Sequence, residues 1–313
     1  MTRIAYLGPE GTFTEAALQH MASQNMIPGT GAVESVAAYG AAAALDMVRN
    51  GSADYACVPI ENSIDGSVTP TLDSLASGAP LRLFAEITLD VAFSIVIRDG
   101  LQAADVATVA AFPVAAAQVR QWLSEHLAGA ELVPANSNAA AAVDVSAGKA
   151  DAGVTTALAA RHHGLTELAS GVVDEPNART RFVLAGLPAR PPARTGADRT
   201  SVVLRIDNSP GALVAALTEF GIRDIDLTRI ESRPTRTELG TYLFFLDCVG
   251  HVDDGAVAEA LKALHRRCAD VRFLGSWPTG SVAGARPPQM DDADHWLENL
   301  RNASPTSSRR ASS

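Results

Sequence analysis

The sequence RIAYLGPEGTFTEAA, residues 3–17, shows how the first half of the chain is built. The apolar run RIAYLG is typical of a strand, GPEG is typical of a turn, and a helix is predicted to begin at Phe13. Thr12 and Glu15 have the Thr-x-x-Glu spacing of a capping box at this helix start. Free backbone N–H groups and the helix dipole at such a terminus could also form an anion site, but a tight strand-to-helix turn explains the same residues.

Strand and helix patterns continue to alternate as far as residue 187. They include two strands within RLFAEITLDVAFSIVI and one helix over residues 114–127. This alternation predicts an α/β fold with a mostly parallel sheet and helices on both faces. Sheets of this kind bind ligands at the carboxyl ends of their strands.

A second block, residues 200–277, follows a linker at residues 188–199 that is rich in proline and arginine. Its order of strand, helix, strand, strand, helix, strand predicts an α+β ferredoxin-like (βαββαβ) domain. Ser209 is the predicted N-cap of its first helix. The composition of residues 278–313 predicts a disordered tail, in which HWLENL forms one or two helical turns.

The composition narrows the range of possible functions. A chain of 313 residues is long enough for two domains, and a net charge of −10 argues against nucleic acid or an anionic membrane as a partner. Three cysteines without a Cys-x-x-Cys pair indicate reduced thiols. No secretory signal, membrane span, metal motif or nucleotide motif is recognisable, so we expect a cytoplasmic protein without a metal or other cofactor.

Polar side chains gather at two places in the first block. Glu61, Asn62 and Ser63 follow a buried strand and indicate a lined pocket, although a polar loop has the same pattern. In NARTRF, the Thr180 hydroxyl can donate to a leaving oxygen and the Arg181 guanidinium can hold a carboxylate. A loop that ends in a surface arginine is the alternative.

Two stretches of the second block carry unusual residues for a small α+β domain. PGALV, residues 210–214, is a helix start, and IESRP, residues 230–234, ends a strand with charged and hydroxyl side chains. Together they could hold the two ends of a zwitterion. A capped helix and an ordinary strand end explain the same residues equally well.

Taken in order, five stretches give the chain a recognisable family pattern: YLGPEGTFTEAA, VPIENSIDGSVTPTLD, NARTRF, DNSPGALVAALTEFGIRDIDLTRIESRP and YLFFLDCVGH. Over residues 3–277 the chain resembles the prephenate dehydratases, in their bacterial form without a fused chorismate mutase. The resemblance implies conversion of prephenate to phenylpyruvate, with loss of water and carbon dioxide, on the route to phenylalanine. It implies no cofactor.

The resemblance also implies an architecture. The catalytic domain would have two lobes, like a type II periplasmic binding protein, with residues 1–79 plus 176–187 in lobe one and residues 80–175 in lobe two. Residues 200–277 would form an ACT domain that binds L-phenylalanine for feedback inhibition. A homo-oligomer, dimer or tetramer, is expected, with phenylalanine sites between ACT domains.

Site residues follow from the same resemblance. Thr180 would be the catalytic donor at the departing hydroxyl and Arg181 the carboxylate clamp, with Glu61 and Asn62 beside them. Phe182 would pack against the substrate ring or anchor its strand. The other expected substrate contacts are Ser63, Gln118 and Thr12. The expected phenylalanine contacts are Asn208, Gly211, Ala212, Leu213, Val214, Glu231, Ser232, Arg233 and Pro234.

One departure from the family pattern lies before the helix of lobe two. The family often has Ser-His-Pro-Gln-x-x-x-Gln, whereas residues 111–118 of this chain are AFPVAAAQ. Pro113 and Gln118 are retained, but the role of the serine at Ala111 is lost or passes to another group. This departure leaves open an inactive protein that senses aromatic amino acids. A dehydratase acting on arogenate also stays open, because arogenate and prephenate differ only at a side-chain keto or amino group.

Overall fold

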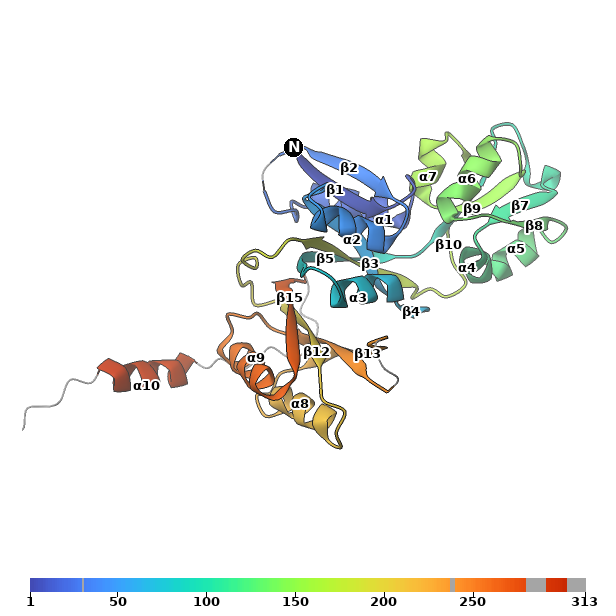
Figure 1. The fold of residues 1–313 in the computed structure, drawn as a ribbon. Coiled ribbons are helices and arrows are strands. Elements are labelled where there is room, and N and C mark those ends of the chain that lie inside the picture. The colour runs from blue at the N-terminus through green and yellow to red at the C-terminus, as the bar shows by residue number, and fades with distance from the viewer. Residues whose placement is uncertain (30, 237–239, 280–290, 303–313) are drawn as a thin grey trace, which may run out of the picture. The chain divides into compact units, whose positions relative to one another are not determined.

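The computed structural model describes residues 1–29, 31–236, 240–279 and 291–302 (Figure 1). The chain divides into two units, residues 1–191 and 192–313, and the boundary falls inside the predicted linker. Each unit has its own sheets and apolar core. Across the described ranges, every helix is too short or too polar to span a bilayer.

The first sheet of unit one is six-stranded, in the order β2-β1-β3-β11-β5 with β4 paired to β3. Because β5 belongs to this sheet, lobe one extends to residue 90, and the implied lobe boundary at residue 79 is wrong. Helix α1 (Phe13–Ser23) covers one face through Leu18 and Met21. Helices α2 (Ala41–Arg49) and α3 (Thr69–Ala76) pack together on the opposite face. The elements are β1 (Thr2–Leu7), β2 (Val33–Ala38), β3 (Tyr55–Asn62), β4 (Gly66–Ser67), β5 (Arg82–Asp90) and β11 (Arg179–Gly186), with helices α1 (Phe13–Ser23), α2 (Ala41–Arg49) and α3 (Thr69–Ala76).

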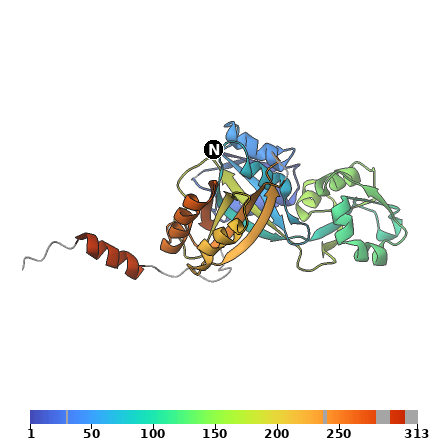
Figure 2. The same ribbon diagram turned by 60° about the horizontal axis from the view of Figure 1, so that its bottom comes forward.

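The second sheet of unit one is five-stranded, in the order β10-β6-β9-β7-β8. Helices α6 and α7 lie on one side of it, and α4 and α5 lie on the other (Figures 1 and 2). The elements are β6 (Phe93–Ile97), β7 (Thr108–Ala111), β8 (Glu131–Pro134), β9 (Ala152–Thr155) and β10 (Thr166–Val172), with η1 (Ala103–Asp105), α4 (Pro113–Gln118), α5 (Arg120–His126), α6 (Asn138–Ser146) and α7 (Ala157–His162).

Two chain segments connect the sheets, and they explain why each sheet has one main strand that runs against the others. β5 leads into β6 and β10 leads into β11, and the Val91 N–H donates to the Ala178 carbonyl oxygen, 2.7 Å away, where the two segments pass. β11 therefore runs antiparallel to β3 and β5, and β6 runs antiparallel to β9 and β10. The other main strands of each sheet run in one direction, so the expected mostly parallel arrangement is confirmed, with one antiparallel crossover strand in each of two sheets.

The single helix predicted over residues 114–127 is wrong, since the chain breaks at Val119 between α4 and α5. Val119 is fully buried in the core of lobe two. The Asp174 N–H donates to the Gln118 carbonyl oxygen (2.7 Å), and the Asp174 carboxylate accepts from the Gln121 N–H (2.9 Å). Asp174 thus occupies groups that a continuous helix would pair internally.

Unit two has the predicted βαββαβ order, in a four-stranded antiparallel sheet with the order β13-β14-β12-β15. Both helices pack on one face, where Phe220 and Leu264 join the apolar core. The elements are β12 (Asp198–Arg205), α8 (Ala212–Gly221), β13 (Leu227–Pro234), β14 (Tyr242–Val249), α9 (Gly255–Arg267) and β15 (Asp270–Pro278).

The start of α8 differs from the prediction. Its N-cap is Gly211, with φ 79°, and the Ser209 side chain makes no cap hydrogen bond. The Ala212 N–H donates to the Ser209 carbonyl oxygen (3.2 Å), which closes a turn before the helix begins. Glycine adopts this left-handed conformation at little cost, so the helix starts two residues later than the serine pattern indicated.

The linker and the tail contain more structure than their composition predicted. His251 Nε2 lies 3.0 Å from the Pro192 carbonyl oxygen, and Arg194 pairs with Asp254 at 2.9 Å, so the end of the linker is tied to unit two. In the predicted tail, α10 (Asp291–Asn302) is a helix of 12 residues, longer than one or two turns. Residues 280–290 and 303–313 lie outside the described residues.

Candidate functional site

Thr180 and Asn62 lie opposite each other on β11 and β3. Asn62 Nδ2 donates to Thr180 Oγ1 at 2.9 Å, while Asn62 Oδ1 accepts from the N–H groups of Ile64 (2.8 Å) and Asp65 (2.9 Å). These two backbone donors fix which end of the amide faces Thr180. The Thr180 oxygen therefore accepts from Asn62, which leaves its own hydrogen to be donated elsewhere.

Ser63 braces the same strand end. Its N–H donates to the Arg179 carbonyl oxygen (2.8 Å), its hydroxyl donates to the Asn177 carbonyl oxygen (3.0 Å), and its Oγ accepts from the Arg179 N–H (2.8 Å). The hydroxyl hydrogen is thus already committed. The structure brings Ser63 next to the Thr180 pair, where it joins β3 to the segment that enters β11.

Arg181 does not lie beside Thr180, because successive residues of a strand point to opposite faces. Its Nε and Nη2 contact Glu61 Oε2 at 3.1 and 2.9 Å, and its Nη1 contacts Glu86 Oε2 at 3.1 Å. The Arg181 side chain is 7% exposed and that of Glu86 is 6% exposed. Arg181 is therefore held between two carboxylates of the protein and is neither a surface arginine nor placed as a clamp next to Thr180.

Phe182 lies in the apolar core beneath the site. It is 2% exposed and belongs to the cluster that contains Tyr6, Leu18 and Leu184. Of its two predicted roles, the structure supports the anchor of β11.

The GPEG turn also differs from the expectation. The Gly11 N–H donates to Glu15 Oε2 at 2.5 Å, so a carboxylate of the chain already occupies the predicted anion site. Thr12 Oγ1 donates to the Leu7 carbonyl oxygen (3.1 Å) and accepts from the Glu15 N–H (3.4 Å). The capping box is half formed, because Glu15 reaches Gly11 instead of Thr12. Thr12, predicted to contact substrate, is occupied within the turn.

A contact between the lobes was missed by sequence reasoning. Thr156 Oγ1 donates to the Gly11 carbonyl oxygen at 2.5 Å and accepts from the Ala159 N–H at 3.0 Å. A Cβ on Gly11, whose φ is +84°, would lie 2.7 Å from the Ala159 Cβ. The start of α1 thus docks on the start of α7. The Thr156-x-x-Ala159 spacing is readable as a helix cap, but its partner in lobe one is not.

Two amides of lobe two have a buried oxygen without a hydrogen-bond partner. Gln118 Oε1, on a side chain that is 8% exposed, and Asn138 Oδ1 are both in this state. Asn138 is the first residue of α6, and its carbonyl oxygen accepts from Thr155 Oγ1 at 2.6 Å at the end of β9. Gln118 was predicted from the sequence, whereas Asn138 and Thr155 were not.

Unit two contains a small cavity of about 100 Å³ at the start of α8. It brings together three of the predicted effector residues, Asn208, Ala212 and Leu213, whereas Val214 is 68% exposed. Residues 231–234 lie on the edge strand β13 and do not line it. The lining residues are Ile206, Asp207, Asn208, Ser209, Ala212, Leu213, Gly240, Tyr242 and Phe244.

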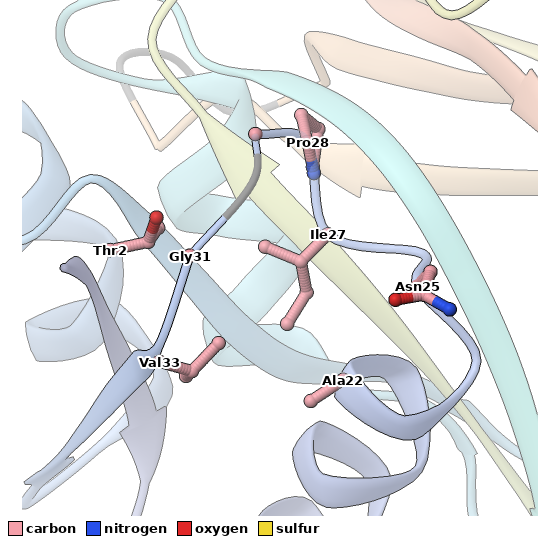
Figure 3. Close-up of a pocket in the computed structure, with 8 residues that line it drawn as sticks. Thr2, Ala22, Asn25, Ile27, Pro28, Gly31 and Val33 are labelled. Atoms are coloured by element: carbon pink, nitrogen blue, oxygen red, sulfur yellow. The ribbon is translucent and has the colours of Figure 1, made fainter.

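A larger cavity, of about 700 Å³, lies elsewhere in lobe one (Figure 3). Ile27, Pro28 and Val33 give it an apolar wall, and Thr2 and Asn25 are polar groups at its edge. It opens at the amino ends of β1 and β2, whereas α/β sheets bind ligands at the carboxyl ends of their strands. None of its lining residues is a predicted site residue.

The cysteines are free thiols, and burial raises the pKa of Cys57 and Cys248 to about 12. They therefore stay protonated at neutral pH. Within the part of the chain that the structure describes, no group of three or more His, Cys, Asp or Glu side chains is arranged to hold a metal ion.

Comparison with known proteins gives a consistent result. Residues 4–189 match the family model for prephenate dehydratase, and residues 200–266 match the model for the ACT domain. A prephenate dehydratase from Mycobacterium sp. strain JLS is 71% identical over 313 residues, covering 98% of each chain.

Solved structures agree with this family match. A prephenate dehydratase from Arthrobacter aurescens, in complex with L-Phe, has a TM-score of 0.86 and 38% identity, and the match covers 96% of this chain and 100% of that one. A protein described as a novel type of quorum quenching acylase has a TM-score of 0.78 and 29% identity, with coverage of 88% and 98%.

Proposed function

Because this chain belongs to the prephenate dehydratase family, we propose that it is a carbon–oxygen lyase that converts prephenate to phenylpyruvate in phenylalanine biosynthesis. The observation that carries the proposal is the Asn62–Thr180 pair, in which the amide donates to the threonine oxygen. The pair leaves the hydroxyl hydrogen of Thr180 available to a substrate.

In the proposed reaction, the bond between the ring and its carboxylate breaks, and carbon dioxide leaves. The electron pair of this broken bond enters the ring, which becomes aromatic. The carbon–oxygen bond to the ring hydroxyl breaks at the opposite side of the ring. Thr180 donates a hydrogen bond to the departing oxygen, which leaves as hydroxide and takes a proton from solvent to become water. A positioned donor contributes typically about 10²–10⁴-fold to such a step.

The substrate carboxylates need partners other than Arg181, because Glu61 and Glu86 contact this guanidinium on the face opposite Thr180. We infer that lobe two supplies polar contacts through the amides of Gln118 and Asn138. The NH2 group of each amide can donate to a carboxylate, and the buried oxygen without a partner can accept from the substrate hydroxyl. Glu61 and Ser63 then hold the strand ends around Asn62, and Phe182 anchors β11 from below.

We further propose that L-phenylalanine inhibits the enzyme through unit two and that the protein is a homo-oligomer, dimer or tetramer. The Arthrobacter aurescens relative, solved with L-Phe, supports the choice of effector. The cavity at α8 holds only about 100 Å³, below the range of roughly 300–1,000 Å³ that is typical of ligand pockets. A second copy would complete it. An effector shifts activity only by its difference in affinity between two states.

The test follows phenylpyruvate formation from prephenate by the purified protein, with and without L-phenylalanine, beside Thr180→Ala. Turnover by the wild type, its collapse in a folded Thr180→Ala variant and inhibition by phenylalanine are expected. A preference for arogenate would change the substrate assignment. A protein that binds phenylalanine without turnover would be a sensor, and a monomer in light scattering would contradict the oligomer.

A further inference from the structure

Glu86, which no sequence motif pointed to, occupies one end of a row of charged side chains across three neighbouring strands. Glu61 on β3, Arg181 on β11 and Glu86 on β5 follow one another on the same face of the sheet. We propose that Glu86 is a positioning residue for the Asn62–Thr180 pair and acts through Arg181 and Glu61. The inference rests on the proposed function, because it concerns the same reaction.

The connection runs through the antiparallel pairing of β3 and β11. Arg181 pairs with Glu61, and the adjacent position pairs Thr180 with Asn62 on the opposite face. The ion pair and the amide–hydroxyl hydrogen bond therefore hold two successive residue pairs of β3 and β11, one on each face of the sheet. A displacement of Arg181 along or across the sheet moves the backbone that carries Thr180.

The register of these two residue pairs depends on side-chain contacts, because the regular backbone pairing of β3 and β11 is interrupted next to them. The register shifts between Arg181 and Phe182, where Phe182 pairs with Pro59 and Ile60 is the extra residue of β3. A slip of one residue in a strand moves each side chain to the other face. The contacts of Arg181 with both neighbouring strands fix the register at the end of this bulge.

Burial makes Glu86 important to the row. The Glu61 side chain is 39% exposed, whereas the Glu86 side chain at the other end of the row is 6% exposed. The contact of Glu86 with Arg181 Nη1, 3.1 Å long, directs the rest of the guanidinium, Nε and Nη2, toward Glu61. An exposed pair on the same two strands, Arg179–Asp90, has side chains that are 60% and 79% exposed. Exposed pairs of this kind contribute little to structure.

The test is Glu86→Gln, which keeps an acceptor for Arg181 but removes the charge. We expect kcat for prephenate to fall roughly 10- to 100-fold with KM nearly unchanged, because a misplacement of about 1 Å can cost about 10²-fold in rate. Asp90→Asn is the matched control on β5, and its kcat is expected to stay at the wild-type value. Far-UV circular dichroism and thermal unfolding verify that both variants are folded.

A double-mutant cycle with Asn62→Ala separates positioning from a general loss of structure. If Glu86 acts through the Asn62–Thr180 pair, Glu86→Gln will lower kcat little further in the Asn62→Ala background, because effects within one unit are not additive. Full multiplication of the two losses would overturn the proposal. So would a wild-type kcat in Glu86→Gln.

A second variant covers the case in which Glu86→Gln does not fold. The paired change Glu86→Leu/Arg181→Met removes both buried charges, and replacing a buried pair by apolar side chains is often neutral for stability. It should fold and show the same loss of kcat, whereas wild-type kcat in it would refute the positioning role. If the wild type itself is inert on prephenate, the proposed function fails. If the wild type is active but the losses in the double-mutant cycle multiply fully, only the positioning role of Glu86 fails.

Discussion

Replacing Asn62 by aspartate reverses one hydrogen bond of the site and leaves its shape unchanged. The new side chain still accepts from the Ile64 and Asp65 N–H groups, but it presents a second acceptor where Asn62 Nδ2 now donates to Thr180 Oγ1 at 2.9 Å. The threonine hydrogen will then turn to the new carboxylate and away from the departing oxygen. Catalysis should fall while the fold is retained.

The size of the loss follows from the strength of the new hydrogen bond. A hydrogen bond to a charged group contributes about 1.5–3 kcal/mol. Each 1.4 kcal/mol is about tenfold in a population, so the hydroxyl will point at the substrate roughly 10- to 100-fold less often. The two backbone N–H donors favour the ionised form of the new carboxyl. The loss should therefore persist over the whole neutral range.

The assay measures kcat at saturating prephenate between pH 6 and 8, with thermal unfolding as the check on folding. Asn50→Asp is a matched control, because Asn50 Oδ1 also accepts a backbone N–H, from Ser52 at 3.0 Å, in an exposed turn. Asn50→Asp should retain wild-type kcat. If Asn62→Asp keeps kcat within about threefold of wild type, Thr180 is not the donor. A threefold change corresponds to well under the 1.4 kcal/mol of a tenfold change, about the smallest loss expected here.

Further predictions concern the lobe contact, the effector cavity and the acid stability of the chain. Gly11→Ala should lower the free energy of unfolding in urea by about 2–4 kcal/mol, since the left-handed conformation and the forced contact with Ala159 each cost about 1–2 kcal/mol. A loss of only about 1–2 kcal/mol, the cost of the left-handed conformation alone, would mean that the lobes do not meet there. Gly211→Ala, at a position with φ 79°, should raise the phenylalanine concentration needed for half-inhibition. Inhibition is measured relative to the uninhibited rate of the same variant. An unchanged inhibition curve would mean that the start of α8 is not part of the effector site. The Thr108 hydroxyl, donating to Asp151, holds the pKa of that carboxyl below its ordinary value, so its stabilisation is present above about pH 4 and is lost as pH falls further. Asp151→Asn should therefore unfold more easily at pH 7 and show a shallower loss of stability in acid, and identical acid slopes would contradict this.

The sequence was most informative where one local pattern determines one local structure. The βαββαβ order of unit two could be predicted because each strand and helix carries its own apolar period and its own turn residues. The helix start at Phe13 was equally readable from Thr12. These features depend on neighbours in the chain, which the sequence displays directly.

Arg181 shows where such reasoning fails. The triplet Thr180-Arg181-Phe182 places a hydroxyl and a guanidinium side by side in the sequence, but the pleat sends them to opposite faces of the sheet. The two partners of Arg181 come from β3 and β5, which lie about a hundred residues away along the chain. No local pattern encodes such a row. Only the antiparallel course of β11, which follows from the crossing of the lobes, reveals it.

That crossing has a consequence for how the chain can be engineered. Lobe two begins after Asp90 and returns at Arg179, and these two residues are partners in one antiparallel ladder. Because entry and exit are adjacent, lobe two has the anatomy of a domain inserted into a β-hairpin. A two-residue turn could replace residues 91–178 and close β5 onto β11, and a different domain with neighbouring termini could be grafted at the same point. The sheet that carries Thr180 is thus a scaffold, and the second lobe is an inserted domain that can be exchanged for another.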